Sequence, residues 1–268
     1  MCSIPPAPLP PPSPSPKTRN SSPAPNIYNN TDQTDYSDIC QWTSDPELRK
    51  TCALNKICLH QPPFKHKYKN YGAIMQVGPT CGLVALSMLL KGKVSPEKLL
   101  NLVKTEGYSN NGEMFSCQNM AKLAEKALSL AGLNHASVQL RKGVYSEETI
   151  QDLLNGAALL VAYDADCNHS PCLRQGHTAH WALVCGIIII VDPKGSYTSD
   201  PNNTYILCRH GKSRNLAAWP LAQLDSSNKN LCEFSPKKKE DGLLYILPDG
   251  GMGGENGLRN QFIILTGL

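Results

Sequence analysis

The feature that most restricts the fold of this chain is a change of hydrophobic pattern near Gly156. Before it, apolar residues recur every three to four positions, as at Met120, Leu123 and Ala127, which is typical of helices. After it come short runs rich in Val, Ile, Leu and Tyr, separated by Gly, Pro, Asn and Asp, which is typical of strands. A chain with its helices first and its strands afterwards is expected to be α+β.

Both patterns divide into individual elements. Ser95 and Pro96 suit the N-cap and the first helical position of one helix, and Gly107 suits its end. Ser146 caps a later helix in the same way. We therefore expect helices at 81–90, 94–107, 114–132 and 146–156, and strands at 158–163, 180–186, 187–192, 204–209, 242–247 and 261–266.

Composition divides the chain into three segments. The first 26 residues are almost all Pro, Ser, Ala and short polar residues, which bury too little apolar area to offset the entropy of ordering a chain. We predict a disordered proline-rich tail at 1–26 and a polar linker at 27–64, with one short helix near 46–57. Residues 65–268 are then one folded domain.

Charge and hydropathy argue against a membrane or nucleic-acid partner. No apolar run has the length of a signal peptide or approaches the roughly 18 residues of a membrane span. The formal net charge is only +4, and the short basic run "SPKKKEDG" has acids beside it, as in a solvated loop. The 11 Cys are odd in number in a long chain without a secretion signal, so we expect reduced thiols and a cytoplasmic protein.

One Cys has the flanking residues of a nucleophile. In "QVGPTCGLVAL", Cys81 opens an apolar helical run, where unpaired backbone N–H groups and the helix dipole favour a thiolate. Thr80 can cap this helix, and Gly82 leaves room for a substrate beside the sulfur. Gln76 lies five residues upstream, within reach of the sulfur if the intervening segment turns tightly, and its side-chain amide would help to form an oxyanion hole.

A catalytic thiol needs a base, and His180 is the strongest of the seven His. It begins the apolar run "HWALVCG" and would lie at the mouth of a buried strand. A hairpin that turns near Gly186 would place Asp192 opposite His180, with Cβ atoms about 4.5–5.5 Å apart. The Asp192 carboxylate would then hold the imidazole in its reactive tautomer, a role that a backbone group or another acid could also take.

A second cluster of reactive side chains raises the alternative of a metal site. The segment "CNHSPCLRQGHTAH" contains Cys167, His169, Cys172, His177 and His180. These are suitable zinc ligands, but the longer segment that separates the two ligand pairs of a zinc finger is absent. We therefore expect no metal and no cofactor, and we interpret the segment as a loop that delivers His180.

The motifs "QVGPTCGLVAL" and "GHTAHWALVCG" resemble those of papain-like thiol peptidases related to bacteriocin-processing peptidases. With "NYGAIM" and "GEMFSCQNMAKLA", residues 65–268 more specifically resemble the actin maturation protease family. The resemblance implies a papain-like fold, with a helical half that carries Cys81 as nucleophile and an antiparallel sheet half that carries His180 as base. It implies Gln76 as oxyanion donor and, less directly, Asp192 as the third residue.

The resemblance also implies a reaction, namely removal of the acetylated N-terminal Met or Cys of actin. The tail "PPAPLPPPSPSP" would form a polyproline II helix, which binds aromatic grooves such as those of profilin, SH3 or WW domains. Two alternatives stay open from the residues alone. One is another thiol hydrolase or transferase, such as a deubiquitinase or a transglutaminase-like enzyme, and the other is a non-catalytic proline-rich adaptor.

Overall fold

A computed structural model of the chain describes residues 45–57, 64–190 and 201–268, all within one compact unit that spans 40–268. The predicted tail at 1–26 and Asp192 lie outside the described residues. Among the described residues, no helix is both long enough and apolar enough to cross a membrane. The helices are α1 Pro46–Leu54, α2 Cys81–Leu89, α3 Pro96–Thr105, α4 Cys117–Leu130, α5 Glu147–Leu154, α6 Leu221–Lys229 and α7 Pro236–Lys239, with a 3-10 turn at Pro201–Asn203. The strands are β1 Phe64–Tyr68, β2 Ser137–Lys142, β3 Ala158–Ala165, β4 Pro171–Cys172, β5 Ala179–Ile190, β6 Thr204–Arg209, β7 Ala217–Pro220 and β8 Gln261–Thr266.

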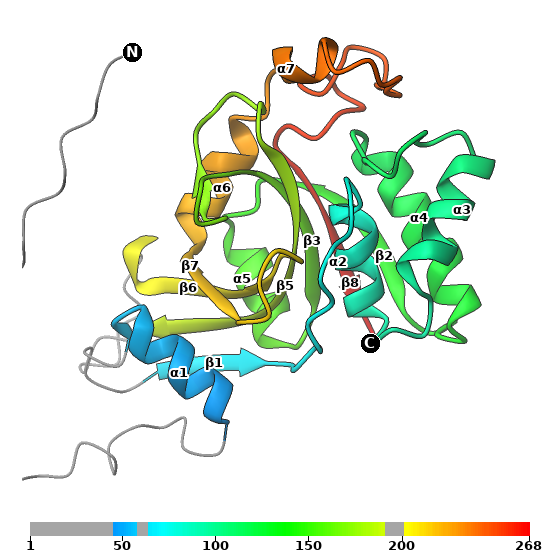
Figure 1. Cartoon of the computed structure of the whole chain (residues 1–268). Coiled ribbons are helices and arrows are strands. Elements are labelled where there is room, and N and C mark those ends of the chain that lie inside the picture. Colours follow the sequence, from blue (N-terminus) through cyan, green and yellow to red (C-terminus); the bar gives the residue numbers. More distant parts are fainter. Residues whose placement is uncertain (1–44, 58–63, 191–200) are drawn as a thin grey trace, which may run out of the picture. The chain divides into compact units, whose positions relative to one another are not determined.

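The strands of the described residues form one antiparallel sheet in the order β2-β8-β3-β5-β6-β7. Strand β1 pairs with the second half of β5, and β4 pairs with the end of β3. The α+β class expected from the sequence is confirmed, because most helices precede most strands along the chain. Figure 1 shows the long central strands β3 and β5 between two groups of helices.

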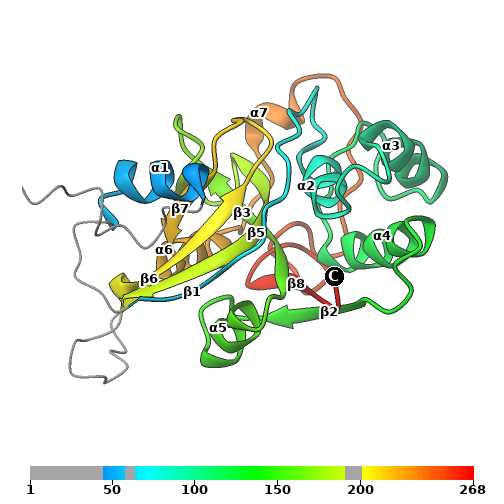
Figure 2. The ribbon, with the colours of Figure 1, turned by 90° about the horizontal axis from the view of Figure 1, so that it is seen from below.

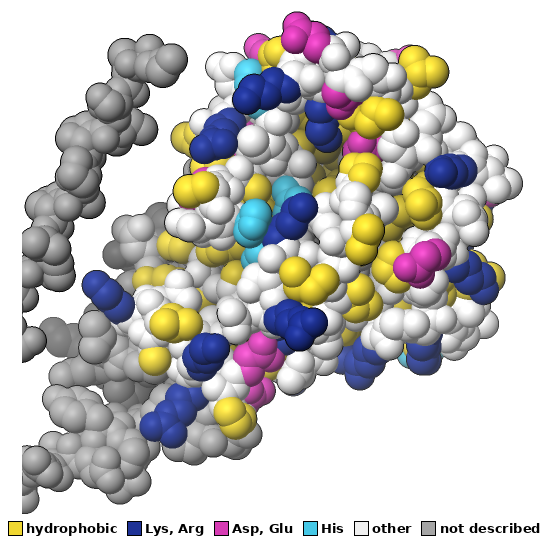
Figure 3. All heavy atoms as spheres, viewed as in Figure 1, with side chains coloured by type: hydrophobic (Ala, Val, Ile, Leu, Met, Phe, Trp, Pro, Cys, Tyr) yellow, Lys and Arg dark blue, Asp and Glu magenta, His cyan; other side chains and the backbone are white. Residues whose placement is uncertain are grey.

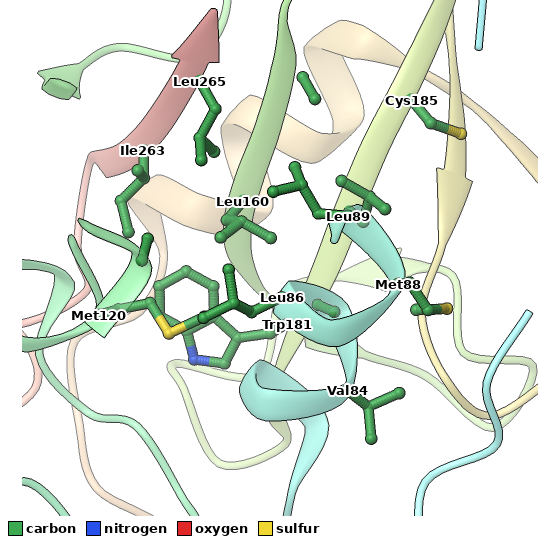
Figure 4. Packing of buried hydrophobic residues seen from close by; sticks show 14 of the residues in the cluster. Val84, Leu86, Met88, Leu89, Met120, Leu160, Trp181, Cys185, Ile263 and Leu265 are labelled. Carbon is green, nitrogen blue, oxygen red and sulfur yellow. The ribbon is translucent and has the colours of Figure 1, made fainter. Parts of the chain in front are cut away.

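Helices cover both faces of this sheet, so β3 is buried along its whole length. Alternate residues of β3 enter two separate hydrophobic cores: Leu160 packs with α2, α3 and α4, whereas Leu159 packs with α5 and α6. Figures 1 and 2 show α2, α3 and α4 together on one side of the strands. The helix that begins with Cys81 is thereby fixed against the sheet. Figure 4 shows part of this packing, with Leu86, Leu89, Met120, Leu160, Trp181, Ile263 and Leu265.

The predicted hairpin at Gly186 is wrong, because β5 continues without a turn from Ala179 to Ile190. Gly186 instead lies where the backbone of β1 passes closely: a Cβ at this position would lie 2.7 Å from the carbonyl oxygen of Lys67. The pairing of β5 with β6 also shifts register between Val184 and Gly186, which is a β-bulge. A glycine needed for close approach was therefore mistaken for a turn residue.

Helix predictions were more accurate than strand predictions. The four helices expected after position 80 are present, and the Ser95 and Ser146 side chains accept hydrogen bonds from the backbone N–H groups of Lys98 and Thr149, as N-caps do. The strand expected at 242–247 is wrong, because this segment is a loop. Strands β1, β2, β4 and β7 and helices α6 and α7 were not predicted.

The short helix expected near 46–57 is confirmed as α1. Leu48 and Cys52 of this helix belong to the buried core. Glu47 accepts two hydrogen bonds from the Arg209 guanidinium, at 2.7 Å and 2.6 Å, at the end of β6. Because Arg209 is only 3% exposed, α1 is joined to the sheet by a largely buried ion pair. The domain boundaries predicted from composition stay a prediction.

Candidate active site

The sulfur of Cys81 lies at the start of α2, as the sequence predicts. The preceding segment turns at Gly78, whose φ of 65° is in the left-handed region that favours glycine. Thr80 occupies the N-cap position, but its hydroxyl donates to the carbonyl of Val77 at 2.9 Å and makes no cap hydrogen bond. The turn therefore leaves the first N–H groups of α2 without a side-chain cap beside the thiol.

Cys81 and His180 line the same cavity, close enough for each to change the pKa of the other. Cys81 comes from α2 and His180 from the start of β5, so the fold brings together two residues that are 99 positions apart in the sequence. The Nε2 atom of His180 lies 2.6 Å from the carbonyl oxygen of His210. A carbonyl can only accept, so Nε2 carries the proton and Nδ1 is the nitrogen left to exchange a proton.

The two partners change each other's pKa. Burial raises the pKa of the Cys81 thiol, but the nearby His180, a hydrogen bond with the Trp181 backbone and the charge of Lys238 lower it, and the net shift is downward. Burial lowers the pKa of His180, but Cys81 and the hydrogen bond to His210 raise it, and the net shift is upward. Both shifts favour a thiolate–imidazolium pair, which is the reactive form of a thiol nucleophile.

Other buried thiols differ from Cys81 in this respect. Burial raises the pKa of Cys185 to about 12 and also raises those of Cys117 and Cys208. Each carries a free thiol in the core with no cationic partner strong enough to offset desolvation. Of these four thiols, only that of Cys81 has a lowered pKa.

Gln76 lies beside this pair. Its backbone N–H donates to the carbonyl of Gly211 at 2.8 Å, and its side-chain Nε2 donates to the carbonyl of Gly78 at 2.7 Å. Gln76, Cys81 and His180 line the same cavity. One of the two Nε2 hydrogens is left for a ligand, since the other is used within the turn. The role of Gln76 as oxyanion donor stays a prediction.

The orienting role expected of Asp192 rested on a hairpin that does not form, and Asp192 itself lies outside the described residues. In the described part of the chain, the carbonyl of His210 accepts the hydrogen bond from Nε2 of His180. The His210 ring is buried and its pKa is lowered to about 4, mainly by burial. No side-chain motif marks a carbonyl oxygen, so sequence patterns could suggest only that some backbone group takes this role.

The cavity around the pair has a volume of about 140 Å³. This is close to the roughly 150 Å³ of an engineered protein cavity that holds one benzene ring, so it suits a single side chain. Three charged side chains, Glu113, Lys212 and Lys238, also line it. Figure 3 shows histidine and basic side chains beside a hollow in this face. The apolar lining consists of Pro79, Met114, Phe115, Ala179, Trp181 and Leu258.

Gly82 does not leave space for a substrate, contrary to the sequence prediction. A Cβ at Gly82 would lie 3.2 Å from Cδ1 of Trp181 and 3.4 Å from Cγ of Met114. The indole N–H of Trp181 donates to the carbonyl of Met114 at 2.9 Å. Gly82 therefore allows the indole to pack against the first turn of α2, which holds the Cys81 helix close to the strand that carries His180.

The loop before His180 is ordered by a buried carboxylate. Asp164 is fully buried and accepts hydrogen bonds from the backbone N–H groups of Arg174, Gly176 and Thr178 at 2.7–3.0 Å. These bonds shape the segment that leads into β5, as expected of a loop that delivers the base. Among the described residues, no group of three His, Cys, Asp or Glu side chains is placed to hold a metal ion.

In comparisons with known proteins, a family model and the relatives of similar sequence carry the same name. Residues 71–188 match a family described as "Actin maturation protease-like, C-terminal domain". The chain is 43% identical to an actin maturation protease of Drosophila melanogaster, over 87% of this chain and 83% of that protein. The mouse protein of this name is 36% identical, over 71% of this chain and 61% of its own length. A solved C39-like peptidase from Bacillus anthracis is 14% identical, with a TM-score of 0.44, and covers 74% of this chain and 96% of its own.

Proposed function

Since the chain belongs to the actin maturation protease family, we propose that it is a cysteine peptidase that removes the acetylated N-terminal residue, Met or Cys, of actin. The observation that carries the proposal is the Cys81–His180 pair, with its shifted pKa values, in a cavity the size of one side chain. The pair supports thiol chemistry, and the family relationship supports the substrate.

In the proposed reaction, the Cys81 thiolate attacks the carbonyl carbon of the acetylated first residue. The first N–H groups of α2 and the side chain of Gln76 stabilise the oxyanion. Imidazolium His180 then donates its Nδ1 proton to the leaving amine as the C–N bond breaks, which gives a thioester and the shortened actin. Neutral His180 removes a proton from water as the water oxygen attacks the thioester carbonyl; the C–S bond then breaks, which releases the acetylated amino acid and restores the thiolate.

The His210 carbonyl has a specific part in this cycle. Because it accepts from Nε2, it keeps that nitrogen protonated and leaves Nδ1 to exchange the proton with sulfur and substrate. It also stabilises the imidazolium, since a carbonyl dipole favours the charged ring. A backbone acceptor does not titrate, so this orientation persists at every pH at which the chain is folded.

The substrate is tested with purified protein and acetylated actin, by mass spectrometry of the actin N-terminus. The wild-type protein is expected to remove one residue, whereas folded Cys81→Ala and His180→Ala variants are expected to leave actin intact. Cleavage of an isopeptide-linked or side-chain amide substrate, with no change to acetylated actin, would instead identify a deubiquitinase or transglutaminase-like enzyme.

The proposal includes a cytoplasmic location and binding of profilin, or another polyproline-binding protein, by the tail at 1–26. The support is the composition of the tail, since polyproline II segments bind aromatic grooves at low entropic cost. Co-precipitation of profilin with the full-length protein, and its loss on deletion of 1–26, would support this part. Equal recovery of profilin with both proteins would contradict it.

A further inference from the structure

We propose that Lys212 and Lys238 form a cationic subsite. It binds an acidic side chain of the substrate in the segment that follows the cleaved peptide bond. The proposal rests on the proposed function, because it concerns substrate choice at the same cleft. Both lysines line the cavity that contains Cys81 and His180.

Lys212 lines the cleft near His180, the residue proposed to protonate the leaving amine. It follows His210 and Gly211, whose carbonyls contact His180 and Gln76, so its backbone position is fixed by the site itself. Its charge is close enough to lower the pKa of His180. Because His180 protonates the leaving amine, the residues just beyond that amine pass beside this imidazole and the adjacent ammonium.

Lys238 is held in place by aromatic rings. Its Nζ atom lies 5.2 Å from the ring centroid of Phe115 and 5.5 Å from that of Tyr245, both within the range of cation–π interaction. Its charge also lowers the pKa of Cys81, which places it near the sulfur. This residue belongs to the basic run "SPKKKEDG", which composition alone suggested to be a solvated loop. One charge of that run is therefore directed to the cleft.

The described acids nearby form no ion pair with these two lysines. Within the described ranges, neither lysine makes an ion pair with a carboxylate. Burial raises the pKa of Glu113, the acid that shares the cavity, and the charge of Lys238 acts in the opposite direction. Glu233 pairs with His177 at 3.3 Å, and Asp241 accepts a hydrogen bond from Tyr245. An incoming carboxylate would thus meet two ammonium groups that are not already in an ion pair within the described residues.

The test uses two acetylated peptides that differ only in having Asp or Asn directly after the first residue. Their dissociation constants are measured with the inert Cys81→Ala protein by isothermal titration calorimetry, so that binding is separated from turnover. We expect the Asp peptide to bind more tightly, and Lys212→Met or Lys238→Met to reduce the Asp-to-Asn affinity ratio by about five-fold each at low salt. Lys98→Met, on the exposed face of α3, is the matched control and should leave the ratio unchanged.

The same ratio should fall as salt is added, because partly exposed charge pairs are screened. Equal affinities for the two peptides, or a ratio that neither cleft variant changes, would overturn the subsite. If Cys81→Ala clearly prefers the Asp peptide in binding but the wild-type protein cleaves neither peptide, the proposed function is overturned and the subsite is supported.

Discussion

Replacing Glu47 by Ala should destabilise the protein and weaken catalysis from a distance. The substitution leaves the Arg209 guanidinium, which is 3% exposed, without its carboxylate partner, and the backbone N–H of Leu216 loses its acceptor, Glu47 Oε1, at 3.2 Å. Removing one partner of a buried pair costs about 3–5 kcal/mol. The Glu47 side chain is 31% exposed, so water offsets part of this, and we expect a loss of about 2–3 kcal/mol.

The effect on catalysis follows from what Arg209 holds. Its guanidinium also donates to the carbonyl of Tyr71 at 2.9 Å and to that of Arg214 at 3.0 Å. Tyr71 lies in the segment that leads to Gln76, and Arg214 lies in the segment that contains Lys212. His210, the residue after Arg209, presents the carbonyl that orients His180. Loss of the ion pair should therefore lower kcat more than it changes KM.

The assay is urea unfolding, followed by kinetics on the folded variant. With a slope of about 2–3 kcal/mol per molar urea for a domain of this size, the midpoint should fall by about 1 M. Glu47→Gln keeps hydrogen-bonding atoms and should lose less. Lys126→Met, which breaks the partly exposed pair with Glu106, is the control and should cost under about 0.5 kcal/mol. A Glu47→Ala midpoint equal to that of the control would refute the reasoning.

Further predictions concern the strand crossing and the thiol. Gly186→Ala should cost about 1–3 kcal/mol, because its Cβ meets the β1 backbone, whereas Gly72→Ala, with open space around it, should be near neutral in the same unfolding assay. Iodoacetamide should alkylate Cys81 fastest of the thiols at pH 7, because the lowered pKa of Cys81 keeps a larger fraction of it as thiolate. In His180→Ala the Cys81 pKa should rise, so that alkylation slows at pH 7 and recovers toward pH 9; an unchanged pH profile would contradict the pairing.

Local signals in the sequence were sufficient for helices α2, α3, α4 and α5 and for the position of Cys81 at a helix start. The N-caps Ser95 and Ser146 act within one turn of their own helices. The Gly-Pro-Thr before Cys81 likewise marks a helix start, and the structure has a helix that begins there. His180 could be selected because it opens a buried strand, and the structure brings it to the thiol as expected. These features depend on residues near one another in sequence.

Features that depend on distant segments were not predicted. Gly186 has the sequence signature of a turn, and only the position of β1 reveals why a glycine is required there. The acceptor for His180 is a backbone atom of His210, which carries no side-chain signature. Lys238 in the cleft lies over the ring of Phe115, a residue more than a hundred positions earlier in the sequence.

The most direct test of the account is intact-mass spectrometry of acetylated actin incubated with wild-type protein and with the folded Cys81→Ala variant. The account predicts that the wild-type protein shortens actin by its acetylated first residue, through a thioester on Cys81, and that the variant leaves the mass of actin unchanged. Processing by Cys81→Ala at the wild-type rate would contradict it.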